Sequence, residues 1–245
     1  MKESIAELRK KCQVDVPLPW NLSHWKRYSI YLTKLFLMTK ITPDQITLLW
    51  IFVGYVGAFF VGIGGYWNGL IGILLYQFAL FLDYNDGEVA RYRNMKHLAG
   101  GFLDDFAGFT MVFLLLLAMG IGGYREFNNA IFLWAGIVAS STAAFDQFVK
   151  LKRFHILIGG NRIDKIQEVM EKISHSKDRL FSIRNRFTTF IFEFFRFHIL
   201  SAVLFAAVFG VLHWLVIIYA IAYGVIFIKS TYGVYKSLKG LQKHG

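Results

Sequence analysis

Long apolar runs dominate the chain from residue 45 onward, and short polar or glycine-rich stretches separate them. A helix needs about 20 mostly apolar residues to cross a bilayer. The pattern therefore predicts an all-α integral membrane protein with six transmembrane helices. The six segments are residues 45–64, 70–91, 99–119, 129–148, 189–209 and 213–228.

Helix start and stop signals mark several of these boundaries. Thr42 and Gln45 can form a capping box, with Pro43 at the first helical position, which predicts a helix start just before the first run. Residues 64–69 indicate a short turn with interfacial aromatic side chains. The glycine-rich stretch 120–124 is expected to end the third helix. The fifth and sixth segments are only weakly divided, because a single glycine interrupts their apolar run.

Aromatic and basic side chains alternate before the first span, between residues 17 and 40. This mixture is typical of an amphipathic helix in the membrane interface, and the alternative is a loosely packed N-terminal tail. We expect residues 1–41 to form an N-terminus with an interfacial helix. Residues 42–245 are expected to form one membrane domain, with a loop at about 150–186 that contains a short amphipathic helix at about 163–173.

Composition excludes a soluble domain. Hydrophobic residues make up 56% of the 245, 25 residues are Phe, and the mean hydropathy is +0.45. A soluble domain of this length could not bury so many large apolar side chains. The single Cys12 rules out an internal disulfide and a cysteine-rich metal site. With so many expected spans, the net charge of +11 favours membrane lipid and an anionic substrate as partners, and no nucleic acid.

The distribution of Lys and Arg predicts the orientation in the membrane. The short loops at 64–69 and 210–213 carry neither residue, and the loop at 120–128 carries only Arg125. All of the 27 Lys and Arg residues except Arg125 lie at the N-terminus, near 91–96, in 150–196 or after residue 228. Cytoplasmic loops are enriched in positive charge. Both termini and the polar end of the second and third helices are therefore expected in the cytoplasm.

A charged block, residues 82–108, lies where the second segment ends and the third begins. On a helix with about 100° per residue, Asp86 lies about 60° from Asp83, so both carboxylates share one face. Asp104 lies on the third segment, and its face can meet theirs. Three converging carboxylates would repel one another unless cations held them. Oxygen ligands without nearby His or Cys favour hard ions such as Mg²⁺, Mn²⁺ or Ca²⁺.

Small residues and a guanidinium accompany these acids. Gly87, Ala90 and Arg91 lie on the face of Asp83 and Asp86, and Gly100 lies on the face of Asp104. The small residues leave room for a nucleotide against the backbone, and the arginine could form a forked contact with a phosphate. The alternative without a binding site is an ordinary charged turn, in which the acids pair with neighbouring arginines and lysines.

The block resembles the signature of the CDP-alcohol phosphotransferase (CDP-alcohol phosphatidyltransferase) family, through the spacing Asp83-x2-Asp86-Gly87-x2-Ala90-Arg91-x8-Gly100-x3-Asp104. The six spans, the interfacial helix and the TPDQIT start of the first span also fit that family. The resemblance covers most of the chain and weakens from residue 150 onward.

The resemblance implies a membrane transferase of phospholipid biosynthesis. In the family, an acceptor hydroxyl attacks the phosphorus that bears the donor's alcohol unit, and CMP leaves. The resemblance implies two divalent cations, Mg²⁺ or Mn²⁺, on the CDP diphosphate, with Asp83, Asp86 and Asp104 as their ligands. It also implies that the CDP-linked donor contacts Asp86, Gly87, Ala90, Arg91 and Gly100. A homodimer is a further expectation, since the family often forms pairs.

One position departs from the family pattern. After Asp104 the family continues with -x3-Asp, which is its proposed general base and a metal neighbour, and this chain has Gly108 there. If the pattern is read from Gly101, it reaches Asp105 but places Phe109 where the acid belongs. Asp105 lies about 100° around the helix from Asp104, which makes it a weak substitute base. One of the two cation sites is therefore expected to be weakened.

Four interpretations of this glycine stay open. The enzyme uses another base, such as Asp105 after a rearrangement, or His97, His155 or His175. Alternatively, its acceptor is already anionic and needs no deprotonation. In the third interpretation the protein is an inactive relative that binds a CDP compound. In the fourth, the glycine is an engineered replacement of aspartate.

Basic residues near the loop are candidates for holding an acceptor phosphate: Lys152, Arg153, Arg184 and Arg186. The alternative is that they serve topology and attraction to anionic lipid. Two other functional classes also stay open, a non-catalytic CDP-alcohol or lipid-binding homologue and a transporter with an acidic ion site. Transporters often carry charged or broken segments at matching positions of two halves. Here the acids cluster at one hairpin, which counts against transport.

Overall fold

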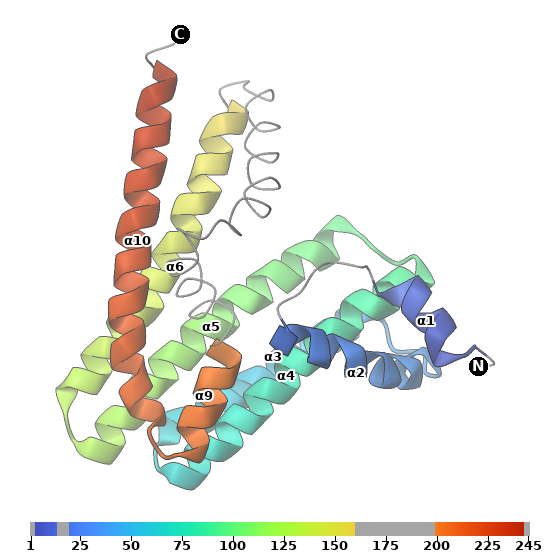
Figure 1. Cartoon of the computed structure of the whole chain (residues 1–245), viewed down its shortest axis with the longest axis horizontal. Helices are drawn as coiled ribbons and strands as arrows, with labels where there is room; N and C mark the ends of the chain where they lie inside the picture. The colour runs from blue at the N-terminus through green and yellow to red at the C-terminus, as the bar shows by residue number, and fades with distance from the viewer. Residues whose placement is uncertain (1–2, 14–19, 160–198, 243–245) are drawn as a thin grey trace.

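The computed structural model describes residues 3–13, 20–159 and 199–242, and within these ranges all regular structure is helical (Figure 1). The helices are α1 (Ile5–Cys12), α2 (Trp20–Leu37), α3 (Pro43–Ile63), α4 (Tyr66–Arg93), α5 (Leu98–Phe127), α6 (Ala130–Gly159), α9 (Ile199–Val208) and α10 (Leu212–Gln242). The all-α prediction is confirmed for these ranges. The amphipathic helix expected at 163–173 and the start of the fifth segment lie outside them.

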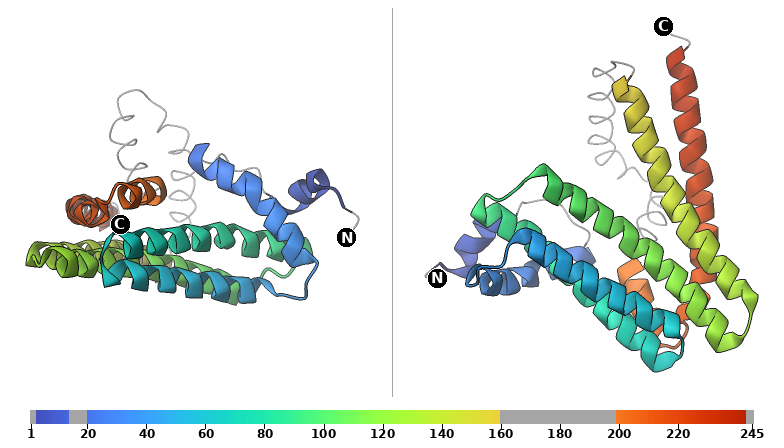
Figure 2. Two further views of the ribbon diagram at one scale, coloured as in Figure 1. Left: turned by 90° about the horizontal axis from the view of Figure 1, so that it is seen from below. Right: turned by 180° about the vertical axis from the view of Figure 1, so that it is seen from behind.

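A layer of three long helices, α3, α4 and α5, forms the centre of the structure (Figures 1 and 2). The helix α6 packs against α5 and α10, while α2 and α9 both pack against α4. Apolar residues of α3, α4, α5, α6, α9 and α10 build one common core. Four of the described helices, α3, α5, α6 and α10, are long and apolar enough to cross a membrane. These helices indicate an integral membrane protein.

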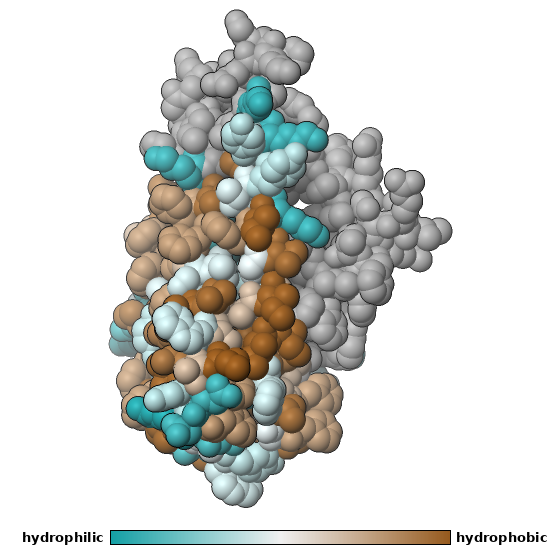
Figure 3. Space-filling view, turned by 90° about the vertical axis from the view of Figure 1, so that its left-hand side faces the viewer, coloured by the Kyte–Doolittle hydropathy of each residue, from teal (hydrophilic) through white to brown (hydrophobic). Residues whose placement is uncertain are grey.

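Surface hydropathy agrees with this assignment. The face in Figure 3 is mainly brown and tan, and hydrophilic residues gather towards its two ends. Large apolar side chains such as Phe52, Phe59 and Trp134 are exposed along the helices. An exposed apolar surface of this extent fits a hydrocarbon environment and not water.

The predicted start of the first span is confirmed. Thr42 caps α3, its Oγ1 accepting from the Gln45 backbone N–H at 3.3 Å, and the Gln45 side chain accepts from the Thr42 N–H at 2.9 Å. The turn that follows α3 is shorter than predicted. Gly64 and Gly65, both at φ +83°, make the connection, and α4 already begins at Tyr66.

The prediction that the glycines of 120–124 end the third helix is wrong. The helix α5 continues to Phe127, and Asn128 follows in the left-handed conformation. A Cβ added at Gly120 would lie 2.6 Å from the Gly136 Cα on α6. Gly120 therefore serves the close approach of α5 and α6, and not chain reversal.

Short connections gather at one end of the molecule, between α3 and α4, between α5 and α6, and between α9 and α10 (Figure 1). Polar contacts join them. Glu126 accepts from the Gly65 N–H at 3.0 Å and lies 3.3 Å from the buried His213, and Tyr66 donates to the Val208 carbonyl at 3.1 Å. The connection between α4 and α5 lies at the other end, beside α1 and α2. That second end carries the charged block.

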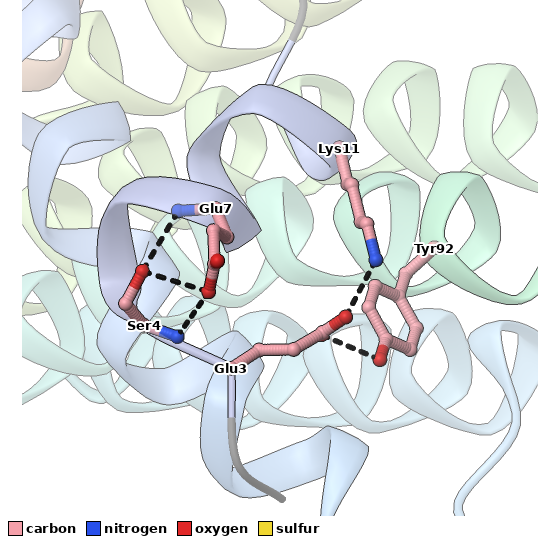
Figure 4. Close-up of polar contacts among 5 residues, drawn as sticks. All are labelled: Glu3, Ser4, Glu7, Lys11 and Tyr92. Carbon is pink, nitrogen blue, oxygen red and sulfur yellow. Dashed lines mark hydrogen bonds and ion pairs between the residues drawn. The ribbon is translucent and has the colours of Figure 1, made fainter.

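The N-terminal helix α1 is fastened to the end of α4. Ser4 and Glu7 form a capping box at its start, and Glu3 accepts hydrogen bonds from Lys11 at 2.5 Å and from the Tyr92 hydroxyl at 2.7 Å (Figure 4). The hydrogen bond from Lys11, followed by that from Tyr92, lowers the pKa of Glu3. The residue that anchors Glu3, Tyr92, lies six positions after Asp86 on α4.

Candidate metal and nucleotide site

Three carboxylates meet where α4 ends and α5 begins. Asp83 and Asp86 come from α4 and Asp104 from α5, and each offers an oxygen so that the three oxygens lie within 4.8 Å of one another. Asp86 is buried, Asp83 is half-buried and Asp104 is exposed. The expectation that the two helical faces can meet is confirmed by this geometry.

The α3 helix holds one of these carboxylates in place. Asp86 Oδ2 accepts hydrogen bonds from Thr47 Oγ1 at 2.7 Å and from Trp50 Nε1 at 2.9 Å. Both donors are buried, and they lie three positions apart on one face of α3. Donors of this kind orient a ligating carboxylate. Two side chains of α3 therefore hold Asp86 in its orientation.

The chemistry of this donor set fits a hard divalent cation. Across the described part of the chain, no Lys, Arg or His side chain forms an ion pair with any of the three aspartates. The ordinary charged turn, in which neighbouring basic residues neutralise the acids, is therefore not what the described residues form. Clustered carboxylate oxygens without nitrogen or sulfur ligands are the donors that Mg²⁺, Mn²⁺ and Ca²⁺ prefer.

The Arg91 side chain lies between Gly87 on α4 and the end of α1. Its Nε donates to the Cys12 backbone carbonyl at the end of α1. Its guanidinium also lies over Gly87, where an added Cβ would meet Arg91 Nη1 at 3.3 Å. The room that Gly87 leaves is therefore partly filled by the tip of this flexible side chain. Ala90, one turn before the end of α4, is half-buried.

Two side chains also lie close to Gly100. An added Cβ there would meet the His97 ring at 3.2 Å and Asp44 Oδ1 at 3.3 Å. His97 caps α5: its Nδ1 accepts from the Gly100 N–H at 2.9 Å, and its Nε2 lies 3.3 Å from Asp44 Oδ2. Because Nδ1 accepts a proton donor, both ring nitrogens are engaged. The described contacts of His97 are therefore a helix cap and a carboxylate of α3.

Gly108 lies one turn beyond Asp104 and is open. Among the residues that the structure describes, no atom beyond the nearby backbone of α5 lies within 4 Å of a Cβ built there. Asp105 is exposed and is not one of the three clustered acids. The structure thus places no acid of the cluster at the position where the family pattern has its last aspartate, and it leaves space for one.

The candidate acceptor residues are only partly described. Lys152 lies in α6 and is exposed. Arg153 also lies in α6, but its side chain is outside the described part, as are Arg184 and Arg186, together with His155 and His175. The assignment of the four basic residues to an acceptor phosphate stays a prediction, as does the role of either histidine as a base.

The sequence alone did not identify the side chains that support Asp86, or the buried glutamate that contacts the N-terminal helices. Thr47 and Trp50 support Asp86, and the buried Glu88 accepts hydrogen bonds from the N-terminal helices. A polar threonine three positions before a tryptophan in an apolar run was the available signal. Its meaning depended on which helix would pack against it.

Comparisons with known proteins show the family of the chain. Residues 40–226 match the family model described as CDP-alcohol phosphatidyltransferase. The chain is 28% identical over 142 residues to a protein of Archaeoglobus fulgidus named bifunctional IPC transferase and DIPP synthase, a match that covers 55% of this chain and 28% of that relative. The chain thus spans less than a third of that relative's length. Both findings confirm the resemblance of the charged block, and the chain belongs to the CDP-alcohol phosphatidyltransferase family.

Proposed function

We propose that the protein is a membrane transferase that moves a substituted phosphate from a CDP-alcohol donor to an alcohol acceptor and releases CMP. The observation that carries this proposal is the meeting of Asp83, Asp86 and Asp104, with oxygens within 4.8 Å of one another. A diphosphate brings two or more negative charges to the site. It can bind beside three carboxylates only if cations lie between them.

In this proposal Asp83, Asp86 and Asp104 hold two divalent cations, Mg²⁺ or Mn²⁺. Such cations neutralise phosphate oxygens and stabilise the charge that develops on the leaving group. Thr47 and Trp50 keep Asp86 oriented for this task. Gly87, Ala90 and Gly100 border the nucleotide, with the His97 side chain moving aside as it enters. Arg91 then contributes its remaining N–H donors to a phosphate.

We also propose how the protein is oriented in the membrane. The loop expected from residue 150 begins later, because α6 continues to Gly159. We place the aspartates, both termini and residues 150–186 at the cytoplasmic face, because the Lys and Arg residues gather there. Six spans are proposed, with α4 counted among them. The α2 helix is proposed to lie in the interface, supported by the exposed apolar residues at helical spacing on its outer face: Tyr28, Tyr31 and Leu35.

Phospholipid synthesis is the proposed setting, and the proposed partners are a CDP-linked donor, membrane lipid and a second copy of the chain. The word transferase in the name of the archaeal relative supports group transfer. The alternatives are a binding homologue without catalysis and a transporter with an acidic ion site.

Exchange of labelled CMP tests the reaction class. Purified protein in membranes with lipid extract and Mn²⁺ is expected to move radiolabel from CMP into a CDP-lipid by the reverse reaction, and chelator is expected to stop it. Label incorporation is measured after lipid extraction. Metal-dependent CDP binding without any exchange would leave the binding homologue as the function. If the protein neither exchanges CMP nor binds CDP, the proposal is wrong.

Gly108→Asp is expected to tighten Mn²⁺ binding in the presence of CDP by about tenfold. The new carboxylate would lie about 40° from Asp104 around α5, in open space. An additional charged ligand raises the affinity of an oxygen site by decades. Mn²⁺ titration followed by electron paramagnetic resonance measures the change. The matched control is Gly108→Asn, which adds nearly the same volume without the charge. Equal affinities for the two variants would contradict a cation at this position.

A further inference from the structure

A buried glutamate joins the N-terminal helices to α4. Glu88 Oε1 accepts from Ser29 Oγ at 2.6 Å and from Gln13 Nε2 at 2.8 Å, and Oε2 accepts from Thr33 Oγ1 at 2.6 Å. Glu88, Ser29 and Thr33 are at most 1% exposed. Asn85, one turn earlier on α4, donates to Thr33 Oγ1 and to the Ser29 carbonyl, both at 2.8 Å. A carboxylate buried with this many donors defines one docking geometry for its partners.

Gln13 connects this network to the candidate nucleotide site. It is the residue directly after Cys12, whose carbonyl accepts from Arg91 Nε. The Gln13 side chain also donates to the Lys26 carbonyl at 2.6 Å. Its amide thus joins the end of α1 to α2 and to Glu88 at the same time. The Gln13 side chain thus ties the end of α1, whose Cys12 carbonyl accepts from Arg91, to the Glu88 network.

The angular order of the residues around α4 places Arg91 between two faces. With about 100° per residue and Asp83 at zero, Gly87 lies at about 40° and Arg91 at about 80°. Glu88 follows at about 140° and Tyr92 at about 180°, on the side that α1 and α2 cover. Arg91 is therefore the residue at the border between the aspartate face and the face that the N-terminal helices occupy.

We propose that the Cys12–Gln13 segment, anchored by Glu88, is a brace that positions the Arg91 guanidinium for the donor diphosphate. The inference rests on the proposed CDP-binding function. Gln13 and Glu88 are positioning residues here and touch no substrate. The family match begins at residue 40, so Cys12 and Gln13 lie outside it. An arginine held at Nε keeps its terminal N–H donors over Gly87, on the side of α4 that carries the aspartates.

A double-mutant cycle on CDP binding tests the brace. The full-length protein in detergent is titrated with CDP in the presence of Mn²⁺. Gln13→Ala is expected to weaken CDP binding about three- to tenfold, and Glu88→Gln is expected to act in the same direction, because each releases the support of Arg91. In an Arg91→Ala background, Gln13→Ala should cause no further loss, since the group it positions is absent.

The matched control is Tyr92→Phe. It removes the Tyr92 hydroxyl that donates to Glu3 in the same α1–α4 contact, but it leaves Cys12, Gln13 and Arg91 in place. CDP binding should not change, and thermal melting of every variant reports general loss of folding. If Gln13→Ala and Tyr92→Phe weaken CDP binding equally, or if the loss adds fully to that of Arg91→Ala, the brace is refuted while CDP binding stands. If the unaltered protein does not bind CDP with Mn²⁺, the proposed function fails and the brace fails with it.

Discussion

The Asp83→Asn variant is expected to lose Mn²⁺-dependent CDP binding by about 10³-fold. Asp83 comes from α4 and lies with Asp86 and Asp104 in one group of carboxylates. An asparagine keeps the size of the side chain but removes the negative charge that a hard cation requires. Without the cation, the diphosphate would face the remaining carboxylates directly. A loss of several kcal/mol, which is about three powers of ten, follows from the removal of such an ion.

Equilibrium binding of labelled CDP at increasing Mn²⁺ concentrations measures this effect. Chelator should reduce the unaltered protein to the level of the variant, and Asp104→Asn should act in the same direction. Glu126→Gln is the control, because it makes the same charge change on α5 at the opposite end of the molecule. If CDP binding persists in Asp83→Asn, or if chelator does not change it, the aspartates do not form the donor site.

The Gly72→Ala variant is expected to destabilise the protein by about 3 kcal/mol, although it adds a single methyl group. An added Cβ at Gly72 would lie 2.5 Å from the Gly57 carbonyl oxygen and 2.8 Å from the Val61 backbone nitrogen, both on α3. Backbone atoms of a helix cannot yield as a side-chain tip does, so α3 and α4 would have to separate. Their separation would also withdraw Thr47 from Asp86.

Gly62→Ala is the matched control for this change. The same methyl group at Gly62 would lie 3.7 Å from the Ala118 Cβ, which is ordinary contact. Alanine is favoured over glycine in a helix by up to about 1 kcal/mol, so this variant should be as stable as the unaltered protein or slightly more stable. Thermal melting in detergent, with size-exclusion chromatography to detect aggregation, compares the two. Equal melting temperatures would show that α3 and α4 do not approach as closely as described.

Much of the helical architecture could be predicted because its causes are local. The length of an apolar run and the Thr42 capping box depend on neighbouring residues alone, so the start of α3 was placed correctly. The shared face of Asp83 and Asp86 follows from helical geometry in the same way. Glycine was harder to interpret. The glycines of 120–124 suggest a helix end to a local reading, but in the structure Gly120 lets α5 approach α6.

The sequence by itself thus determined the helical class, the membrane environment and the three aspartates as candidates, since hydropathy and residue spacing are properties of the chain. Only the tertiary structure decided that Asp104 meets the α4 acids, that Thr47 and Trp50 hold Asp86, and that no other described helix covers Gly108. It also decided that the end of α1 holds Arg91. Each of these facts depends on how separate helices pack, and packing brings together residues whose distance along the chain carries no signal of contact.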